Sequence, residues 1–444
     1  MPGDGSLGYA DRLSYRADLG GKLGQPEKAE QEQKVAAKAL KLAELIRSSE
    51  HFVCFTGAGI STACGIPDFR GPNGVWTRQR RGQPLPKASI PFEHARPSLT
   101  HMALLALQKE GKLKYLCSQN VDSLHLRSGY PRRLMAELHG NCFAERCPQC
   151  HKEFVRDFEV CSVGFKPTGR KCDACGGALK DNCLDWDNAL PVDELEQTER
   201  HAARADLALC LGTSLVIIPA CDIPLLALKK GKKGSAKPDG GKLAIVNLQA
   251  TQHDKRASLV VHAKVDEVMR AVMGHLGLAI PDYVRTDRLL VSHSTDARLG
   301  SSSDSSLATT TLSIQLTSVH GADCPLPWLA KCELRFAHQP ADAPPAATAE
   351  ESDGGAGDAP WLLSVDVSDR AAWPPQEVYV ARLTLSFAQG TTSPPQTIEY
   401  PFELGSGAKR RRGGAAEFTF ETCRVRYDGV ADGGGAAGSS GSSS

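Results

Sequence analysis

Two pairs of cysteines have the spacing that most directly specifies chemistry in this chain. Cys147 and Cys150 form one CxxC pair, Cys172 and Cys175 form the second, and twenty-one residues separate the pairs. Each pair can hold two corners of one tetrahedral metal site. The pattern predicts a zinc-ribbon module with one Zn²⁺, which is structural because four thiolates leave no open position. The alternative is a set of surplus buried thiols.

A glycine-containing turn follows a short apolar run at 52–55 and offers a place for an anionic ligand. The turn reads TGAGIS at 56–61, and glycine lets the backbone approach a diphosphate closely. Taken alone it fits a plain tight turn equally well, because Thr62 stands where a dinucleotide-binding fingerprint has its third glycine. The next segment, GIPDFR at 65–70, adds a carboxylate, a stacking ring and a cation, which favours a ligand site.

Two further polar residues could act on a substrate. His139 lies in ELHGN at 137–141, just before the first cysteine pair, and Asn120 lies in NVD at 120–122. An imidazole titrates near neutrality and suits general acid–base catalysis. A lone histidine is also common in purely structural roles, and no nucleophile stands beside it in the sequence. Both interpretations of His139 stay open on local sequence alone.

Short apolar strands and amphipathic helices must position these residues. Strands are predicted at 52–55, 113–117, 207–211 and 243–246, and helices at 30–49, 97–107 and 265–278. Each strand ends in polar residues, and strands alternate with helices, which is typical of a doubly wound, Rossmann-like α/β fold with a parallel sheet. In such sheets ligands bind at the carboxyl ends of the strands.

The composition changes after Ile280. Residues 301–306 are rich in serine and predict a linker, and apolar residues at every second position beyond them predict an antiparallel, β-sandwich-like domain. The segment 339–360 and the tail after Asp432 are expected to lack structure. The basic run at 409–412 is either a nuclear import signal or a solvated loop.

Overall composition excludes several classes of protein. The chain has 444 residues, 41% of them hydrophobic and 23% charged, with a formal net charge of +1. That balance argues neither for nucleic acid nor for an acidic partner. We expect no signal peptide and no membrane span, since the apolar stretch at 207–228 contains Asp222 and two prolines. The 15 cysteines then predict reduced thiols and metal binding rather than disulfides.

Taken together, the motifs resemble the sirtuin family. Seven blocks occur in family order: GAGIST at 57–62, GIPDFRG at 65–71, SQNVD at 118–122, LHGN at 138–141, the paired CxxC, GTS at 212–214 and IVNLQ at 245–249. GPNGVWT at 71–77 and LDWDNALP at 184–191 resemble the nuclear, chromatin-associated branch. The region after Tyr283 resembles the C-terminal extension of plant and green-algal members. Ser123 departs from the family pattern, which has glycine after NVD.

The resemblance implies NAD and one structural Zn²⁺ as cofactors, and an acylated lysine on a histone or another protein as the partner. It implies that His139 is a general base and that Asn120 is also catalytic. The cofactor-binding residues that it implies are Ala58, Thr62, Phe69, Arg70, Trp76, Gln119, Asp122, His139, Gly212, Ser214, Asn247, Gln249 and Val265. The metal ligands remain Cys147, Cys150, Cys172 and Cys175.

The predicted activity is NAD-dependent deacylation of protein lysine, releasing nicotinamide and O-acyl-ADP-ribose, in the nucleus and on chromatin. Alternatives are mono-ADP-ribosyl transfer from the same site and a non-catalytic, NAD-sensing chromatin scaffold. The expected organisation is an N-terminal segment at 1–29, a catalytic unit at 30–140 and 181–282, a zinc-ribbon module at 141–180, a linker at 283–309, a β-rich unit at 310–430 and a tail at 431–444.

Overall fold

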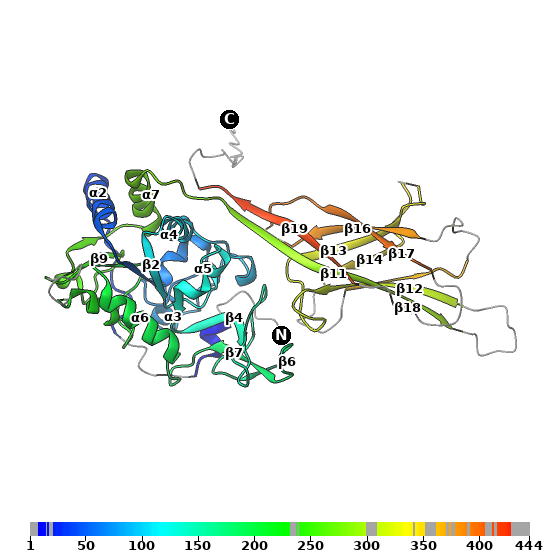
Figure 1. Ribbon diagram of the computed structural model, residues 1–444, viewed down its shortest axis with the longest axis horizontal. Coiled ribbons are helices and arrows are strands. Elements are labelled where there is room, and N and C mark those ends of the chain that lie inside the picture. The colour runs from blue at the N-terminus through cyan, green and yellow to red at the C-terminus, as the bar shows by residue number, and fades with distance from the viewer. Residues whose placement is uncertain are drawn as a thin grey trace, which may run out of the picture.

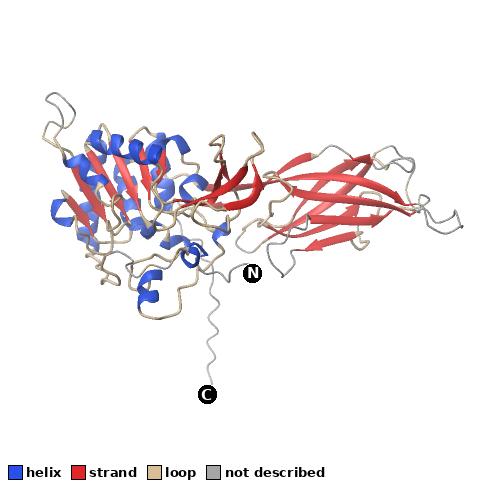
Figure 2. Ribbon diagram, turned by 90° about the horizontal axis from the view of Figure 1, so that it is seen from below, coloured by secondary structure: helices blue, strands red, loops and turns tan. Residues whose placement is uncertain are grey.

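A computed structural model describes residues 8–14, 16, 21–230, 237, 239–298, 309–340, 342–350, 361–369, 373, 378–388, 391–404, 411–412 and 415–427. Figure 1 shows an elongated molecule with a mixed α/β body at one end and an all-β body at the other. A small sheet containing β4 and β7 lies on the side of the α/β body that faces the all-β body (Figures 1 and 2).

The helices fall almost entirely in the α/β body. They are α1 Gly8–Arg12, α2 Glu32–Ser48, α3 Val75–Arg80, α4 Leu99–Lys109, α5 Leu124–Arg127, α6 Val192–Arg204 and α7 Val265–Leu276. Short 3-10 helices are η1 Ala58–Ile60, η2 Thr62–Cys64, η3 Phe92–His94, η4 Arg132–Leu134, η5 Ile223–Leu228 and η6 Asp254–Arg256.

The strands of the α/β body and of the small sheet are β1 Phe52–Thr56, β2 Leu113–Ser118, β3 Met135–Glu137, β4 Gly140–Arg146, β5 Glu153–Val155, β6 Pro167–Lys171, β7 Ala178–Cys183, β8 Leu207–Leu211, β9 Lys242–Val246 and β10 Leu259–Val261. Those of the all-β body are β11 Tyr283–Arg298, β12 Thr309–Ser318, β13 Leu329–Phe336, β14 Ala347–Glu350, β15 Trp361–Asp366, β16 Tyr379–Phe387, β17 Gln396–Phe402, β18 Arg411–Arg412 and β19 Ala416–Val425.

Six parallel strands form the central sheet in the order β10-β9-β8-β1-β2-β3. Every residue of β1 and β8 is buried, because helices cover both faces of the sheet (Figure 2). Residues of α2, α4 and α7 share one hydrophobic cluster with the sheet, and residues of α6 and η5 share another. The predicted Rossmann-like architecture is confirmed.

The strand order reverses between β1 and β8. From β1 the chain runs outward through β2 and β3, then returns to β8 on the other side of β1 and runs outward through β9 and β10. At such a reversal the connections after the two central strands diverge, and ligands bind at this point in open α/β sheets. The loops after β1 and β8 carry the glycine turn and the GTS block.

The zinc-ribbon segment folds as a four-stranded antiparallel sheet in the order β5-β4-β7-β6. It is inserted between β3 and α6, so its first strand leaves the parallel sheet directly after His139.

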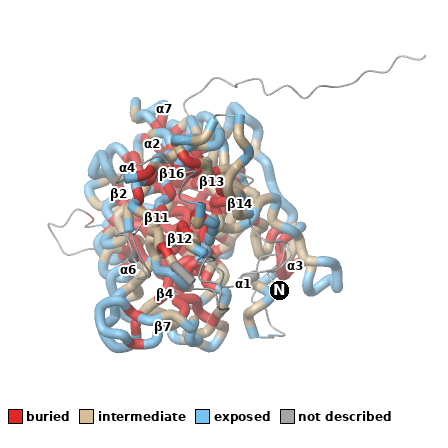
Figure 3. Tube along the Cα trace, turned by 90° about the vertical axis from the view of Figure 1, so that its right-hand side faces the viewer, coloured by how far each residue is buried: buried red, intermediate tan, exposed pale blue. Residues whose placement is uncertain are grey.

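Two antiparallel sheets make the all-β body a sandwich. One has the order β15-β12-β11-β18 with β19 paired to β11, and the other has the order β14-β13-β16-β17. Burial alternates along β12 and β13, which buries one face of each strand between the sheets, and buried positions gather around β13 and β16 in Figure 3. The predicted β-sandwich-like domain is therefore confirmed.

Two expectations for this region are wrong. The linker predicted at 283–309 is a strand over Tyr283–Arg298, because β11 pairs with both β12 and β19 along its length. The unstructured segment predicted at 339–360 contains β14, which pairs with β13. The serine-rich stretch 301–306, residues 351–360, Lys409, Arg410 and the tail after Asp432 lie outside the described residues. Within the described part of the chain, no helix has the length and apolar character needed to cross a membrane.

Candidate functional site

Glycine backbones bring the loops after β1 and β8 into direct contact. The amide of Gly59 donates to the carbonyl of Gly212 at 2.8 Å, and Gly57 N donates to Leu211 O at 3.1 Å. A Cβ on Gly59 would lie 2.8 Å from Gly212 Cα, and Gly212 itself has a φ of 58°. Side chains would separate the loops, so the glycines are required by this close approach.

His139 is held at the junction between the parallel sheet and the zinc module. Its Nδ1 lies 3.0 Å from the carbonyl oxygen of Gln119, and its own carbonyl accepts from Leu184 N at 3.2 Å. The next residue, Gly140, has a φ of 81°, and a Cβ there would lie 1.9 Å from Asn182 O. Burial lowers the pKa of His139 to about 4, so the imidazole is neutral near pH 7.

Asn120 and Asp122 both form a hydrogen bond with Ser61, which lies in the loop after β1. Ser61 Oγ donates to Asp122 Oδ2 at 2.6 Å, and Asn120 Nδ2 donates to Ser61 Oγ at 3.3 Å and to Gly57 O at 3.2 Å. All three side chains are buried, and burial raises the pKa of Asp122. The contacts fix the NVD segment against the glycine turn.

Ser123 has a left-handed backbone with a φ of 61°. The family pattern has glycine at this position, and the structure supplies the reason: the chain must turn left-handed before α5. Ser123 Oγ accepts from Asn141 Nδ2 at 3.3 Å, and Leu124 N donates to Asp122 Oδ1 at 2.9 Å. Serine is therefore accommodated, with less backbone freedom than glycine would have.

Aromatic rings gather around the half-buried cation Arg70 at the end of GIPDFR. The ring of Phe69 lies 4.6 Å from Trp76, Trp76 lies 4.9 Å from Trp186, and Arg70 Cζ lies 4.3 Å from the centre of the Trp76 ring. Partial burial lowers the pKa of Arg70 to about 10, because removal from water disfavours the charged guanidinium. An anion bound beside Arg70 would favour the charged form of its guanidinium.

The remaining predicted cofactor residues lie on the other half of the same sheet edge. Asn247 Nδ2 donates to Gln249 O at 2.9 Å, and Gln249 Nε2 donates to Gln25 O at 2.7 Å. Gln119 Nε2 donates to Thr213 Oγ1 at 3.3 Å, which links the loops after β2 and β8. Val265 is buried at the start of α7, which packs against η1.

The structure therefore gathers the predicted site residues at one edge of the sheet. Those on the loops after β1 and β2 and at the start of the zinc module are Ala58, Thr62, Gln119, Asn120, Asp122 and His139. Those on the loops after β8 and β9 are Gly212, Ser214, Asn247 and Gln249. Thr62 is exposed, and its hydroxyl donates to Gly59 O at 3.2 Å.

Three contributors were not predicted as site residues: Ser61, Thr213 and Trp186. Each lies inside a block that the sequence analysis identified: Ser61 in GAGIST, Thr213 in GTS and Trp186 in LDWDNALP. The blocks indicated the region but not the contacts, because the contacting residues are far apart in the chain. Ser61 contacts Asn120, Thr213 contacts Gln119 and Trp186 contacts Trp76, at separations of 59, 94 and 110 positions.

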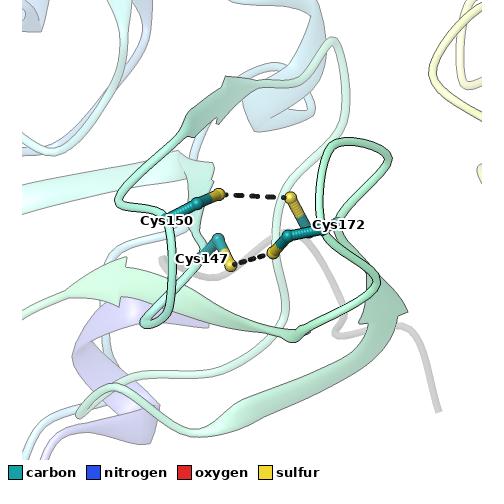
Figure 4. Close-up of side chains that lie close together, drawn as sticks. Cys147, Cys150 and Cys172 are labelled. Carbon is teal, nitrogen blue, oxygen red and sulfur yellow. Dashed lines mark hydrogen bonds between the residues drawn. The ribbon is translucent and has the colours of Figure 1, made fainter.

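The four predicted zinc ligands converge. Their sulfur atoms all lie within 4.8 Å of one another, with Cys147 and Cys175 at 3.4 Å and Cys150 and Cys172 at 3.6 Å (Figure 4). Four thiolates around tetrahedral Zn²⁺ at about 2.3 Å stand about 3.8 Å apart, so the cluster fits this ion.

A cavity of about 330 Å³ lies elsewhere, in the β-sandwich. Its lining includes Phe336, Trp373 and Asp366. It contains no predicted site residue, and it lies on strands of the other body. The sheet edge and not this cavity is the candidate catalytic site.

Comparison with known proteins agrees with this geometry. The Sir2 family profile matches residues 57–93 and 83–219. An NAD-dependent protein deacetylase, SRT1 of Oryza sativa subsp. indica, is 47% identical over 401 residues, which span 90% of this chain and 76% of that protein. The chain belongs to the Sir2 family. The predicted family is thus confirmed for this sirtuin.

Two other relatives and one solved structure show the same similarity. The protein deacetylase SRT1 of Arabidopsis thaliana is 50% identical over 74% of this sirtuin and 67% of that protein. The deacetylase Sirt6 of Drosophila melanogaster is 46% identical over 63% of this sirtuin and 87% of that protein. A structure of Sir2 bound to acetylated peptide is 31% identical over 53% of this sirtuin and 98% of that chain, with a TM-score of 0.41.

Proposed function

We propose that this sirtuin is an NAD-dependent protein-lysine deacylase that acts on histone or other protein substrates. The observation that carries the proposal is the position of His139 and Asn120, which come from separate segments and lie at the one sheet edge where the strand order reverses. The relatives named NAD-dependent protein deacetylase support the same activity.

The residues at this edge fit NAD. Arg70, a half-buried cation against Trp76, suits a diphosphate, and the ring of Phe69 suits the nicotinamide side. Asn247 and Gln249 suit the adenosine half, and Asp122 the nicotinamide ribose. When bound, NAD supplies the ribose carbon that accepts the acyl oxygen of the substrate lysine.

His139 is proposed as the general base. A carbonyl oxygen only accepts hydrogen bonds, so the contact with Gln119 places the proton on Nδ1 and leaves Nε2 as the basic atom. Asn120 is proposed as the residue that orients the reacting groups, because its amide is fixed by Gly57 and Ser61.

The four cysteines are proposed to hold zinc for structure alone, since their sulfurs close on one another and leave no coordination position open. We also propose a catalytic unit at 30–140 and 181–282, a zinc module at 141–180, and a β unit that begins at Tyr283 instead of after a linker.

Nuclear location and chromatin association are proposed as well. The basic run at 409–412 supports import, as it has the composition of an import signal. Replacing these four residues with alanine in the tagged full-length chain should reduce nuclear accumulation, measured by microscopy. Unchanged accumulation would remove this support.

The activity is tested with acylated histone peptides and NAD. Deacylated peptide and free nicotinamide should appear in equal amounts, and Asn120→Ala should lower both, because the reacting groups are no longer oriented. Mass spectrometry of the peptide separates the outcomes: loss of the acyl group supports deacylation, whereas added ADP-ribose contradicts it. Absence of both products with every acylated peptide would identify a scaffold.

A further inference from the structure

Three side chains of metal-binding type meet on the loops after β8 and β9, and none of them belongs to the predicted cofactor-binding residues or to the tetrathiolate cluster. They are Cys221 and Asp222, just before η5, and His253, just before η6. One ligand atom from each lies within 4.8 Å of the other two. The residues follow β8 and β9, which are neighbours in the parallel sheet, so both loops lie at the same edge.

Burial divides the cluster into an inner and an outer part. Cys221 is 1% exposed and His253 is 7% exposed, whereas the Asp222 side chain is 56% exposed. The sulfur and the imidazole thus form the inner wall, and the carboxylate closes the cluster at the solvent side. An ion can reach the group from solvent past Asp222.

One buried nitrogen in this cluster lacks a hydrogen-bond partner. Among the described residues, His253 Nε2 makes no hydrogen bond, although it lies 3.4 Å from Asp222 Oδ1. A buried polar atom without a hydrogen-bond partner is destabilising, because its desolvation is not compensated. A cation shared by the imidazole, the carboxylate and the thiolate would satisfy it.

The loops that carry the three residues are already fixed. Thr251 Oγ1 donates to Asp254 at 2.6 Å and accepts from His253 N at 3.3 Å, which holds the histidine backbone. The side chain of Gln252 donates to Leu215 O at 2.7 Å and joins this loop to the one after β8. The ligand atoms therefore need little rearrangement to close on an ion.

We propose that Cys221, Asp222 and His253 bind a second Zn²⁺ per chain, separate from the tetrathiolate zinc. Sulfur, imidazole and carboxylate ligands suit Zn²⁺, whereas Mg²⁺ and Ca²⁺ take oxygen ligands. Binding deprotonates the Cys221 thiol and releases its proton to solvent. Three protein ligands leave the fourth position to water. The bound ion fixes the loops after β8 and β9 to each other.

The test is metal stoichiometry of the full-length protein, which does not depend on its enzymatic activity. Protein retaining the tetrathiolate zinc is titrated with Co²⁺, and absorption is followed. The wild type should bind one Co²⁺ with a thiolate-to-cobalt charge-transfer band, and Zn²⁺ should displace it. Cys221→Ser and His253→Gln should lose the band. Asp222→Asn changes an exposed side chain, so it should fold normally and bind Co²⁺ more weakly.

Matched controls lie outside the cluster. Cys161 and His275 are exposed, so Cys161→Ser and His275→Gln should bind Co²⁺ as the wild type does. Binding of Zn²⁺ should also raise the unfolding temperature of the wild type, but not that of Cys221→Ser. A wild-type protein that takes up no second metal, or a folded Cys221→Ser variant that keeps the band, overturns the proposal.

Discussion

The imidazole Nδ1 of His139 lies 3.0 Å from the carbonyl oxygen of Gln119, the residue that follows β2. The contact fixes the ring orientation and the tautomer, and Gln119 in turn is fixed because its backbone N–H donates a hydrogen bond to Thr56 O at 3.0 Å. Burial keeps the imidazole neutral, so its Nε2 accepts a proton without first losing one.

His139→Ala should lower deacylation at least ~100-fold, the usual contribution of a positioned general base. Zinc content and unfolding temperature should stay near those of the wild type. Because the pKa of His139 lies below the ordinary 6.5, activity should hold as pH falls through 6.5 and decline only near its own pKa of about 4. The pH profile of peptide deacylation measures this. A His139→Ala variant at the wild-type rate would falsify the assigned base, and His275→Ala serves as the control.

Ser123→Gly should change the free energy of unfolding by no more than about 1 kcal/mol, because two effects oppose each other. Glycine removes the strain of a serine in the left-handed conformation, but it also raises the conformational entropy of the unfolded chain. Ser123→Val should be destabilised by about 1–3 kcal/mol more, since a β-branched residue resists this conformation. Ser128 is also buried but has a φ of −67°, so Ser128→Val is the matched comparison. Denaturant unfolding measures the stability of all three variants. If Ser123→Val and Ser128→Val lose the same free energy of unfolding, the left-handed conformation of Ser123 is not the cause of the loss.

Cys147→Ser should remove the structural zinc and unfold or aggregate the module at 141–180, because metal binding contributes directly to its folding. Metal analysis and far-UV circular dichroism of the purified protein check this. Cys161→Ser changes an exposed thiol outside the cluster and should leave both unchanged. A soluble, zinc-free Cys147→Ser protein with full activity would refute the assignment.

Arg285→Met should destabilise the junction between the two bodies. Arg285 Nε lies 2.9 Å from Asp287 Oδ2, and its Nη1 donates to Glu93 O at 2.9 Å, so β11 holds the loop at η3. Removing one partner of a buried ion pair costs about 3–5 kcal/mol. Arg288 pairs with Glu417 on the surface, and Arg288→Met should cost about 1 kcal/mol or less. Denaturant unfolding measures the stability of both variants. If Arg285→Met and Arg288→Met lose the same free energy of unfolding, the buried ion pair contributes no more to stability than the surface pair.

Local sequence predicted the α/β body well because its parallel strands are buried on both faces. Such strands are short, continuous apolar runs, and β8 was predicted over the same residues that the structure shows, Leu207–Leu211. β11 was missed because polar residues dominate it and buried apolar residues such as Leu289 and Val291 are few. Its partner is distant, since Leu289 pairs with Phe418, and such pairing leaves no local pattern.

The candidate site shows the same limit. Motif blocks located His139 and Asn120, but the hydrogen bonds of Ser61 depend on how the loops after β1 and β2 meet. Cys221 and His253 carry no motif at all, and only the neighbouring positions of β8 and β9 bring them together.

Strand β11 is a long strand that belongs to both bodies of the molecule. Its sixteen residues start at Tyr283, which packs into the core of the α/β body, and continue through the sandwich without a break. At about 3.3 Å per residue the strand spans about 50 Å. The strand therefore joins the core of the α/β body to the sandwich through paired backbone, with no unpaired linker between Tyr283 and Arg298. Any change in the direction of the sandwich relative to the α/β body must therefore bend or break the pairing of β11 with β19 near Tyr283.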